Sequence, residues 1–231
     1  MEFVFQPSAP ITVPVAGSSA LFPVHRIYCV GRNYVEHAQE MGHTGREAPF
    51  FFMKPADAVL PVPYGTLGQM PYPSMSTDLH HEIELVAAIG TGGRNIAAAD
   101  AAAHVWGYAV GLDMTRRDLQ SEAKKLGRPW CTGKGFDYSA PIGPIHPVAE
   151  AGAIEQAAIT LTVNGAPRQT STIAKLIWSV AETIEHLSKY YELQPGDLIF
   201  TGTPAGVAAV QMGDVLEGEI SGLGALRVKI V

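Results

Sequence analysis

The stretch His80–Gly90, with the sequence HHEIELVAAIG, carries the main argument for both the fold and the chemistry of this chain. Its second half, Leu85–Ile89, is continuously apolar and predicts a buried strand. Glu82 and Glu84 stand two residues apart at its start, a spacing that puts both side chains on one face of a strand. Burying two carboxylates together is costly unless a cation lies between them. The pair therefore either binds a metal ion or faces solvent.

The composition of the chain bounds what the protein does. Its 231 residues, 47% of them hydrophobic, suit one sizeable domain with a core of its own. The net charge of −6 and the lack of a basic cluster argue against a nucleic-acid partner. Two cysteines, Cys29 and Cys131, cannot form a disulfide framework and favour a reducing compartment. With no signal peptide and no apolar run of about 18 residues, we expect a cytoplasmic protein without a membrane partner.

Short strands separated by turns dominate the rest of the chain, in which 24 glycines and 17 prolines are scattered. We expect an irregular N-terminal arm over residues 1–25, with a short edge strand at 3–5, and a single domain over residues 26–231. The region 61–76 is predicted to be a loop. Strands are predicted at 27–30, 50–53, 80–90, 106–112, 159–163, 168–171 and 198–201, with one or two more in 215–231.

Few helices are expected beside these strands. The composition of Tyr34–Met41 favours a helix, as does the alanine-rich run 97–103. A helix over Arg116–Leu126 is predicted to start at a Thr115 cap. The one strongly periodic segment, Ile173–Tyr191, predicts an amphipathic helix. The fold class is therefore α+β and dominated by β structure.

A third carboxylate strengthens the metal hypothesis. Asp113 stands at the end of the next strongly apolar strand, where a helix is about to begin. Hard cations such as Mg²⁺ prefer carboxylate oxygens, and no Cys or His pair has the spacing of a zinc site. A solvent-facing strand remains the alternative for Glu82 and Glu84.

Other residues suit acid–base or anion chemistry. On a helix, His37 and Glu40 at i and i+3 lie side by side, as a general base and its orienting carboxylate do, although surface pairs of this kind are common. Lys134, between two glycines, can stabilise an oxyanion, although most loop lysines are simply solvated. The glycine-rich segment 201–206 is either a ligand-binding loop or a plain turn. No Gly-x-Ser-x-Gly elbow is present, which argues against serine hydrolysis.

Taken together, the motifs resemble the fumarylacetoacetate hydrolase family across residues 27–231. The segments that carry the resemblance are YCVGRNYVEHAQEMG, PFFFMKPADAV, HHEIELVAAIG, GYAVGLDMTRRDLQ, GRPWCTGKGFDYSAPIGP, VNGAPRQ, LIWSVAETIEHLS and LQPGDLIFTGTPAGV. Each segment alone is a weak signal, but the set is specific. The resemblance implies a mixed β-roll fold, a catalytic role for residues 26–231 and a homodimer.

The resemblance also implies a role for each candidate residue. The expected metal ligands for Mg²⁺ or Mn²⁺ are Glu82, Glu84 and Asp113. The expected catalytic residues are His37 and Glu40, which activate water, and Lys134 with Gln120, which stabilise an oxyanion. The expected substrate-binding residues are Lys54, Thr203, Arg32, Arg116 and Arg117, the three arginines being candidates for a distal carboxylate. The additional metal aspartate of larger family members has no counterpart here.

Within the family, the chain is most similar to bacterial fumarylpyruvate hydrolases of the gentisate pathway. This implies a metal-dependent hydrolase that cleaves the C–C bond of a small 2,4-diketo acid. Oxaloacetate decarboxylation and the isomerisation or decarboxylation of homoprotocatechuate breakdown are alternatives on the same scaffold. A non-catalytic metal- or ligand-binding module is a further alternative, against which the His37–Glu40 pair argues because binding alone needs no base.

Overall fold

Two large sheets form the body of the molecule, described here from a computed structural model over residues 2–34 and 46–231. The larger sheet has the order β4 (Phe50–Lys54), β3 (Ile27–Gly31), β15 (Leu198–Phe200), β8 (Ile83–Ile89), β9 (Val105–Leu112), β11 (Ala140–Ile142) and β5 (Val59–Pro61), and β12 (His146–Pro147) also pairs with β9. The second has the order β14 (Ala166–Thr172), β13 (Ala158–Val163), β17 (Val215–Ile220), β18 (Gly224–Ile230) and β6 (Gly68–Met70). The expected β-dominated α+β fold is confirmed.

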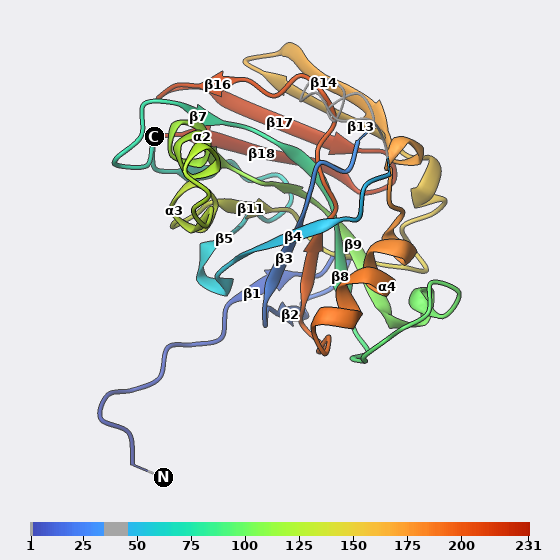
Figure 1. Cartoon of the computed structure of the whole chain (residues 1–231). Coiled ribbons are helices and arrows are strands. Elements are labelled where there is room, and N and C mark those ends of the chain that lie inside the picture. The colour runs from blue at the N-terminus through green and yellow to red at the C-terminus, as the bar shows by residue number, and fades with distance from the viewer. Residues whose placement is uncertain (1, 35–45) are drawn as a thin grey trace.

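Smaller elements complete the described part of the chain. A small sheet joins β10 (Thr115–Arg116), β7 (Leu79–His80) and β16 (Ala209–Val210), and β1 (Thr12–Pro14) pairs with β2 (Leu21–Pro23). The α-helices are α2 (Arg117–Lys125), α3 (Cys131–Lys134) and α4 (Val180–Tyr190), and the 3₁₀ helices are η1 (Ala56–Ala58), η2 (Ala101–His104), η3 (Ile154–Gln156) and η4 (Ile173–Lys175). In Figure 1, α2 and α3 lie at one side of the sheets and α4 at the other. No helix among these residues is long and apolar enough to cross a bilayer.

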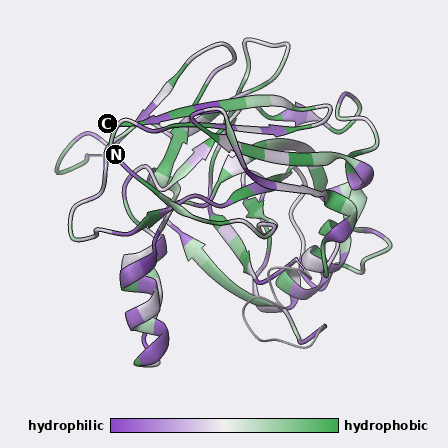
Figure 2. Ribbon diagram, turned by 90° about the horizontal axis from the view of Figure 1, so that it is seen from above, coloured by the Kyte–Doolittle hydropathy of each residue, from purple (hydrophilic) through white to green (hydrophobic). Residues whose placement is uncertain are grey.

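Strand β8 is the centre of the fold. All seven of its residues are buried, which confirms the strand expected from the apolar run. Ile83 and Leu85 pack in the core shared with the second sheet, while Val86 and Ala88 pack in a separate core on the opposite face. Figure 2 shows hydrophobic residues along the strands of the body. Glu84 alternates with Ile83 and Leu85 and therefore points away from the inter-sheet core.

The long helix predicted over residues 173–191 begins later than expected. After η4 the chain forms an isolated bridge at Leu176 and then bends, and the Ile177 N–H donates to the Asn33 carbonyl at 2.8 Å. Helix α4 starts at Val180 because Ser179 and Glu182 form a capping box, each bonding the other's backbone N–H. The apolar stripe that predicted one helix thus comes from a 3₁₀ turn, a short non-helical stretch and a shorter helix.

Several smaller predictions are also wrong. No strand forms at residues 3–5, and the arm instead pairs further along as β1 and β2. The supposed loop 61–76 contains β6, because Gly68–Met70 pairs in parallel with β18. The alanine-rich run is helical only as η2. Thr115 does not cap α2, since it pairs with His80 in β10 and its hydroxyl donates to the Asp113 carbonyl. The helix expected over 34–41 lies, beyond Tyr34, outside the described residues.

Candidate active site

Three carboxylates meet where β8 begins and β9 ends. The two strands are antiparallel, with Ile83 paired with Leu112, so the residue before β8 and the residue after β9 are adjacent. The Asp113 N–H donates to the Glu82 carbonyl at 2.8 Å. One carboxylate oxygen from each of Glu82, Glu84 and Asp113 lies within 4.8 Å of the others, and all three residues are buried. The structure therefore brings the three predicted ligands together.

Three cations, Lys134, Arg117 and Lys54, neutralise part of this cluster. Lys134 Nζ donates to Glu82 Oε2 at 2.7 Å and to Asp113 Oδ2 at 2.6 Å. Arg117, in the first turn of α2, pairs with the other oxygen of Glu82. Glu84 receives a hydrogen bond from the Gly202 N–H at 2.7 Å. Of the three carboxylates, Glu84 is thus the one left without a direct cationic partner among the described residues.

The two glutamates differ in protonation for this reason. Burial opposes ionisation of Glu82, but the charges of Lys134 and Arg117 outweigh it and lower the pKa of Glu82. Burial raises the pKa of Glu84 well above its usual range, and the neighbouring charges of Asp113 and Glu82 raise it further. Without a metal ion, the cluster therefore favours a proton on Glu84. A divalent cation would replace that proton.

The donor set fits Mg²⁺ or Mn²⁺. Among the described residues the cluster consists of carboxylates alone, which is the hard oxygen environment that these ions prefer. Asp113 Oδ1 is buried and forms an ion pair with Lys54 Nζ at 2.8 Å, without a hydrogen bond of good geometry. An ionised carboxylate has about four lone-pair sites, so this oxygen could also coordinate a metal ion.

Lys54 lies behind the cluster, where it holds other residues in place. Its ammonium group donates to the backbone carbonyls of Met114 at 3.1 Å and Ser139 at 3.0 Å, and also to that of Lys134. These bonds join the segment after β9 to the end of α3. Lys54 therefore positions Asp113 and Lys134, and it does not line the cavity described next.

The carboxylates form the floor of a narrow inner cavity of about 50 Å³. An outer cavity of about 540 Å³ lies beside it, and the two share Arg32, Phe50, Phe52 and Trp130 among their lining residues. The Trp130 ring centroid is 5.4 Å from that of Phe50 and 5.6 Å from that of Phe52. An aromatic wall thus leads from the outer cavity to the charged floor.

Most of the predicted site residues within the described ranges gather here. Besides the three carboxylates, the lining of the inner cavity includes Lys134, Gln120, Arg117, Arg32 and Thr203. Arg116 does not line it, because its guanidinium lies 4.4 Å from the centroid of the Phe136 ring. His37 and Glu40 lie outside the described residues.

Sequence reasoning missed the aromatic wall, Lys124 and Gln169. Phe50 and Phe52 alternate on one strand, which was a signal for a shared face. Lys124 lies four residues after Gln120, a spacing that puts both on one face of α2. Gln169 is fully buried and donates to Thr203 Oγ1 at 2.8 Å, a contact across distant segments with no signature in the sequence.

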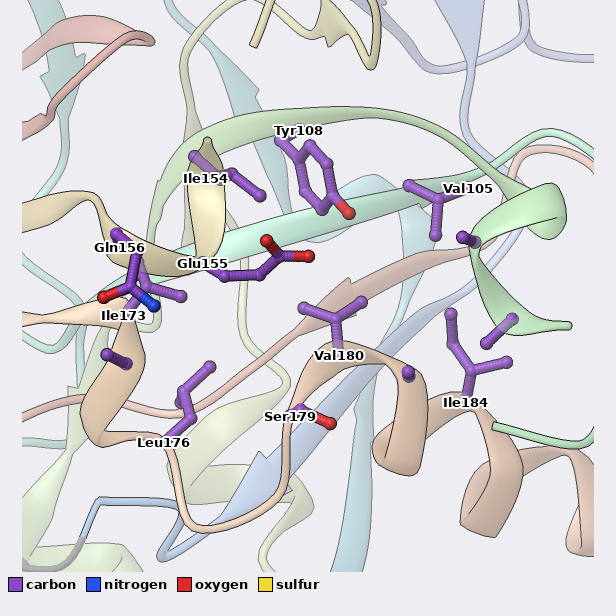
Figure 3. Close-up of a pocket in the computed structure, with 14 residues that line it drawn as sticks. Val105, Tyr108, Ile154, Glu155, Gln156, Ile173, Leu176, Ser179, Val180 and Ile184 are labelled. Atoms are coloured by element: carbon purple, nitrogen blue, oxygen red, sulfur yellow. The ribbon is translucent and has the colours of Figure 1, made fainter. Parts of the chain in front are cut away.

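A third cavity, of about 350 Å³, lies elsewhere, between η2, β9, η3, η4 and α4 (Figure 3). Aliphatic side chains such as Val105, Val180 and Ile184 surround it. Glu155 is the only carboxylate among its described lining residues. The described lining residues of this cavity offer no set of metal ligands, so the candidate metal site is in the inner cavity, which Glu84 lines.

Comparisons with known proteins agree with this geometry. A crystal structure of fumarylpyruvate hydrolase from Pseudomonas aeruginosa, in complex with Mn²⁺ and pyruvate, matches with a TM-score of 0.97 and 57% identity, covering 100% of this chain and 99% of that one. A fumarylpyruvate hydrolase from a Ralstonia species is 47% identical over 69% of this chain and 82% of the relative. A mitochondrial oxaloacetate tautomerase from Rattus norvegicus is 40% identical over 88% of this chain and 90% of the relative.

The family model described as fumarylacetoacetate hydrolase C-terminal matches residues 26–231. That range contains both large sheets and every carboxylate of the cluster. The chain belongs to the fumarylacetoacetate hydrolase family.

Proposed function

We propose that this protein is a metal-dependent hydrolase that cleaves the C–C bond of acylpyruvates, with fumarylpyruvate as its substrate. The observation that carries the proposal is the buried cluster of Glu82, Glu84 and Asp113, joined by Lys134, at the floor of an aromatic-walled cavity. The similarity to fumarylpyruvate hydrolases at 57% and 47% identity supports the choice of substrate. The products are fumarate and pyruvate.

The three carboxylates are proposed to hold Mg²⁺ or Mn²⁺. When bound, such an ion supplies a Lewis acid for the carboxylate and 2-oxo oxygens of the substrate and for the enolate that leaves. The chain itself fixes the ligands, since Asp113 bonds the Glu82 backbone and Glu84 bonds the Gly202 N–H. All three carboxylates are buried and line the inner cavity, so a bound ion would be reached only from that cavity.

Water activation is assigned to His37 with Glu40, two residues outside the described ranges. The His37 imidazole is proposed to take a proton from water, which attacks the carbonyl carbon on the far side of the bond to be cleaved. Lys134, with Gln120 beside it in the cavity lining, is proposed to stabilise the oxyanion that results. The C–C bond then breaks to give fumarate and the pyruvate enolate as the leaving group, and the enolate takes up the proton that His37 removed from water.

A substrate panel tests this proposal. The purified protein with Mn²⁺ is given fumarylpyruvate, maleylpyruvate, acetylpyruvate or oxaloacetate, and pyruvate release is followed by a coupled assay. We expect the largest kcat/KM with fumarylpyruvate. Faster pyruvate release from oxaloacetate than from every acylpyruvate would favour the decarboxylase alternative. Interconversion of the enol and keto forms of oxaloacetate without pyruvate release, followed by ultraviolet absorbance, would favour a tautomerase like the relative at 40% identity.

The role of His37 is tested separately from the metal site. We expect His37→Ala to abolish turnover while leaving Mn²⁺ affinity, measured by titration calorimetry, unchanged. Normal turnover by His37→Ala would refute its assignment as the base.

We further propose that the enzyme acts in the gentisate pathway in the cytoplasm and forms a homodimer. The two free cysteines, one of them exposed, support a reducing compartment. Three consecutive apolar residues of the arm, Phe3, Val4 and Phe5, are exposed in the single chain, which supports burial against a second copy. Light scattering after size-exclusion chromatography will give the mass, and a monomer would refute the dimer.

A further inference from the structure

Four cationic side chains line the inner cavity among the described residues, and two of them pair with the carboxylate cluster. Arg117 and Lys134 are both paired with Glu82 and so belong to the carboxylate cluster. Arg32 lies over an aromatic ring and lines both cavities. Lys124 is exposed and makes no ion pair with another described residue. Its ammonium group is therefore available to an anion in the cavity.

Helix α2 places Lys124 on the same face as two residues of the cluster. Arg117, Gln120 and Lys124 lie at positions i, i+3 and i+7, and all three line the inner cavity. Lys124 stands one helical turn, about 6 Å along the axis, beyond Gln120. The helix thus presents a polar row that starts at the carboxylates and leads outward. Lys125, the next residue, lies about 100° away around the helix and does not line the cavity.

The aromatic wall lines the same cavity as this polar row. Phe50, Phe52 and Trp130 offer flat apolar surfaces along the same cavity. Such surfaces suit a planar conjugated carbon chain but cannot solvate a charge. A ligand held at the carboxylate cluster by one end and carrying a second carboxylate at the other therefore needs a cation elsewhere in the cavity lining.

We propose that Lys124 binds the distal carboxylate of the substrate and selects acylpyruvates with a second carboxylate over those ending in a methyl group. This inference rests on the proposed acylpyruvate hydrolase function. The flexible four-carbon stem of lysine lets the ammonium group follow the end of the substrate while the helix stays fixed. A charge-assisted hydrogen bond supplies the discrimination, since acetylpyruvate has no group to accept it.

The matched variants Lys124→Met and Lys125→Met test the proposal. Both remove one exposed positive charge from the last turn of α2, but only the first removes it from the cavity. We expect Lys124→Met to lower kcat/KM for fumarylpyruvate about tenfold, mainly through KM. The value for acetylpyruvate should stay within about twofold of the wild type. Lys125→Met should leave both substrates unchanged, and Lys124→Arg should restore most of the loss.

Two outcomes would overturn the proposal. One is an equal loss for both substrates in Lys124→Met, which would indicate a general effect on the site. The other is no loss for fumarylpyruvate. Circular dichroism and thermal unfolding of each variant establish that it is folded before its kinetics are compared.

A binding experiment separates failure of this inference from failure of the proposed function. If the wild type releases pyruvate from neither substrate, the hydrolase function fails, and the subsite is tested with 2-oxoadipate and 2-oxohexanoate. These acids have equally long chains and differ only in the second carboxylate. Calorimetry with the Mn²⁺-loaded protein should show that Lys124→Met weakens 2-oxoadipate about tenfold and leaves 2-oxohexanoate unchanged. Equal weakening, or none, would refute the role of Lys124.

Discussion

At the scale of single residues, charge balance governs the site. Glu82 has two cationic partners, whereas Glu84 has only a backbone N–H, although both sit on the same short stretch. The difference arises from Lys134 and Arg117, which reach the cluster from α3 and α2. Loss of the Glu84 carboxylate is therefore expected to weaken metal binding. Loss of the Lys134 ammonium group is expected to destabilise the metal-free protein.

Glu84→Gln should weaken metal binding without unfolding the metal-free protein. The raised pKa of Glu84 favours its neutral form, which the glutamine amide resembles. Loss of a ligand should lower Mn²⁺ affinity by at least about 100-fold, because even a lost outer-shell partner costs 10- to 100-fold. Titration calorimetry measures the affinity, with exposed Glu150→Gln as the control. Unchanged affinity in Glu84→Gln would exclude this carboxylate as a ligand.

Lys134→Met should destabilise the metal-free protein. It leaves the buried carboxylates of Glu82 and Asp113 without the ammonium they share, a loss of about 3 kcal/mol in the free energy of unfolding. Urea unfolding measures this change. Lys189→Met, which breaks an exposed pair with Glu185, should cost less than about 0.5 kcal/mol. Similar losses in the two variants would contradict the argument from burial.

At the scale of elements, helix starts and strand pairs decide where side chains point. The antiparallel pairing of β8 with β9 brings Glu82 and Asp113 together. Helix α2 then aligns Arg117, Gln120 and Lys124 along one cavity wall. Helix α4 is shorter than the helix predicted over 173–191, because the capping box at Ser179 fixes its first turn.

Ser179→Ala should destabilise α4 by about 1 kcal/mol, since it leaves the Glu182 N–H without its acceptor. Ser179→Thr keeps the hydroxyl and should recover most of this loss. Chemical unfolding monitored by circular dichroism measures both variants. Equal stability of Ser179→Ala and the wild type would show that the cap contributes nothing.

The cap should also weaken in acid. Partial burial opposes ionisation of Glu182, but hydrogen bonds from Ser179 and the ion pair with Arg46 lower its pKa below the usual 4.5. A lowered folded pKa means that this stabilisation is present above about pH 4.5 and disappears as the pH falls through the folded value. The stability difference between the wild type and Glu182→Gln should therefore shrink in acid. A difference that stays constant from neutral to acid pH would contradict this.

At the scale of the whole molecule, metal binding should stabilise the fold. An ion that binds only the folded cluster adds about 2.7 kcal/mol at a concentration 100 times its Kd. We expect Mn²⁺ to raise the Tm and excess chelator to lower it and remove activity, with activity restored by Mg²⁺ or Mn²⁺. Thermal unfolding and the pyruvate assay measure both effects. Full activity in excess chelator would refute the metal role.

The sequence by itself determined the local features of this protein. The apolar run after Glu84 predicted the buried strand β8, the Asn164–Gly165 turn predicted the hairpin of β13 and β14, and motif resemblance predicted the family. These depend on residue types and short-range spacing, which the chain displays directly. Only the tertiary structure decided that Lys54 holds backbone carbonyls, that Arg116 turns away, and that Lys124 lines the cavity. The physical reason is that these side chains contact residues far away in the sequence, and only the packing of the chain brings those residues close enough.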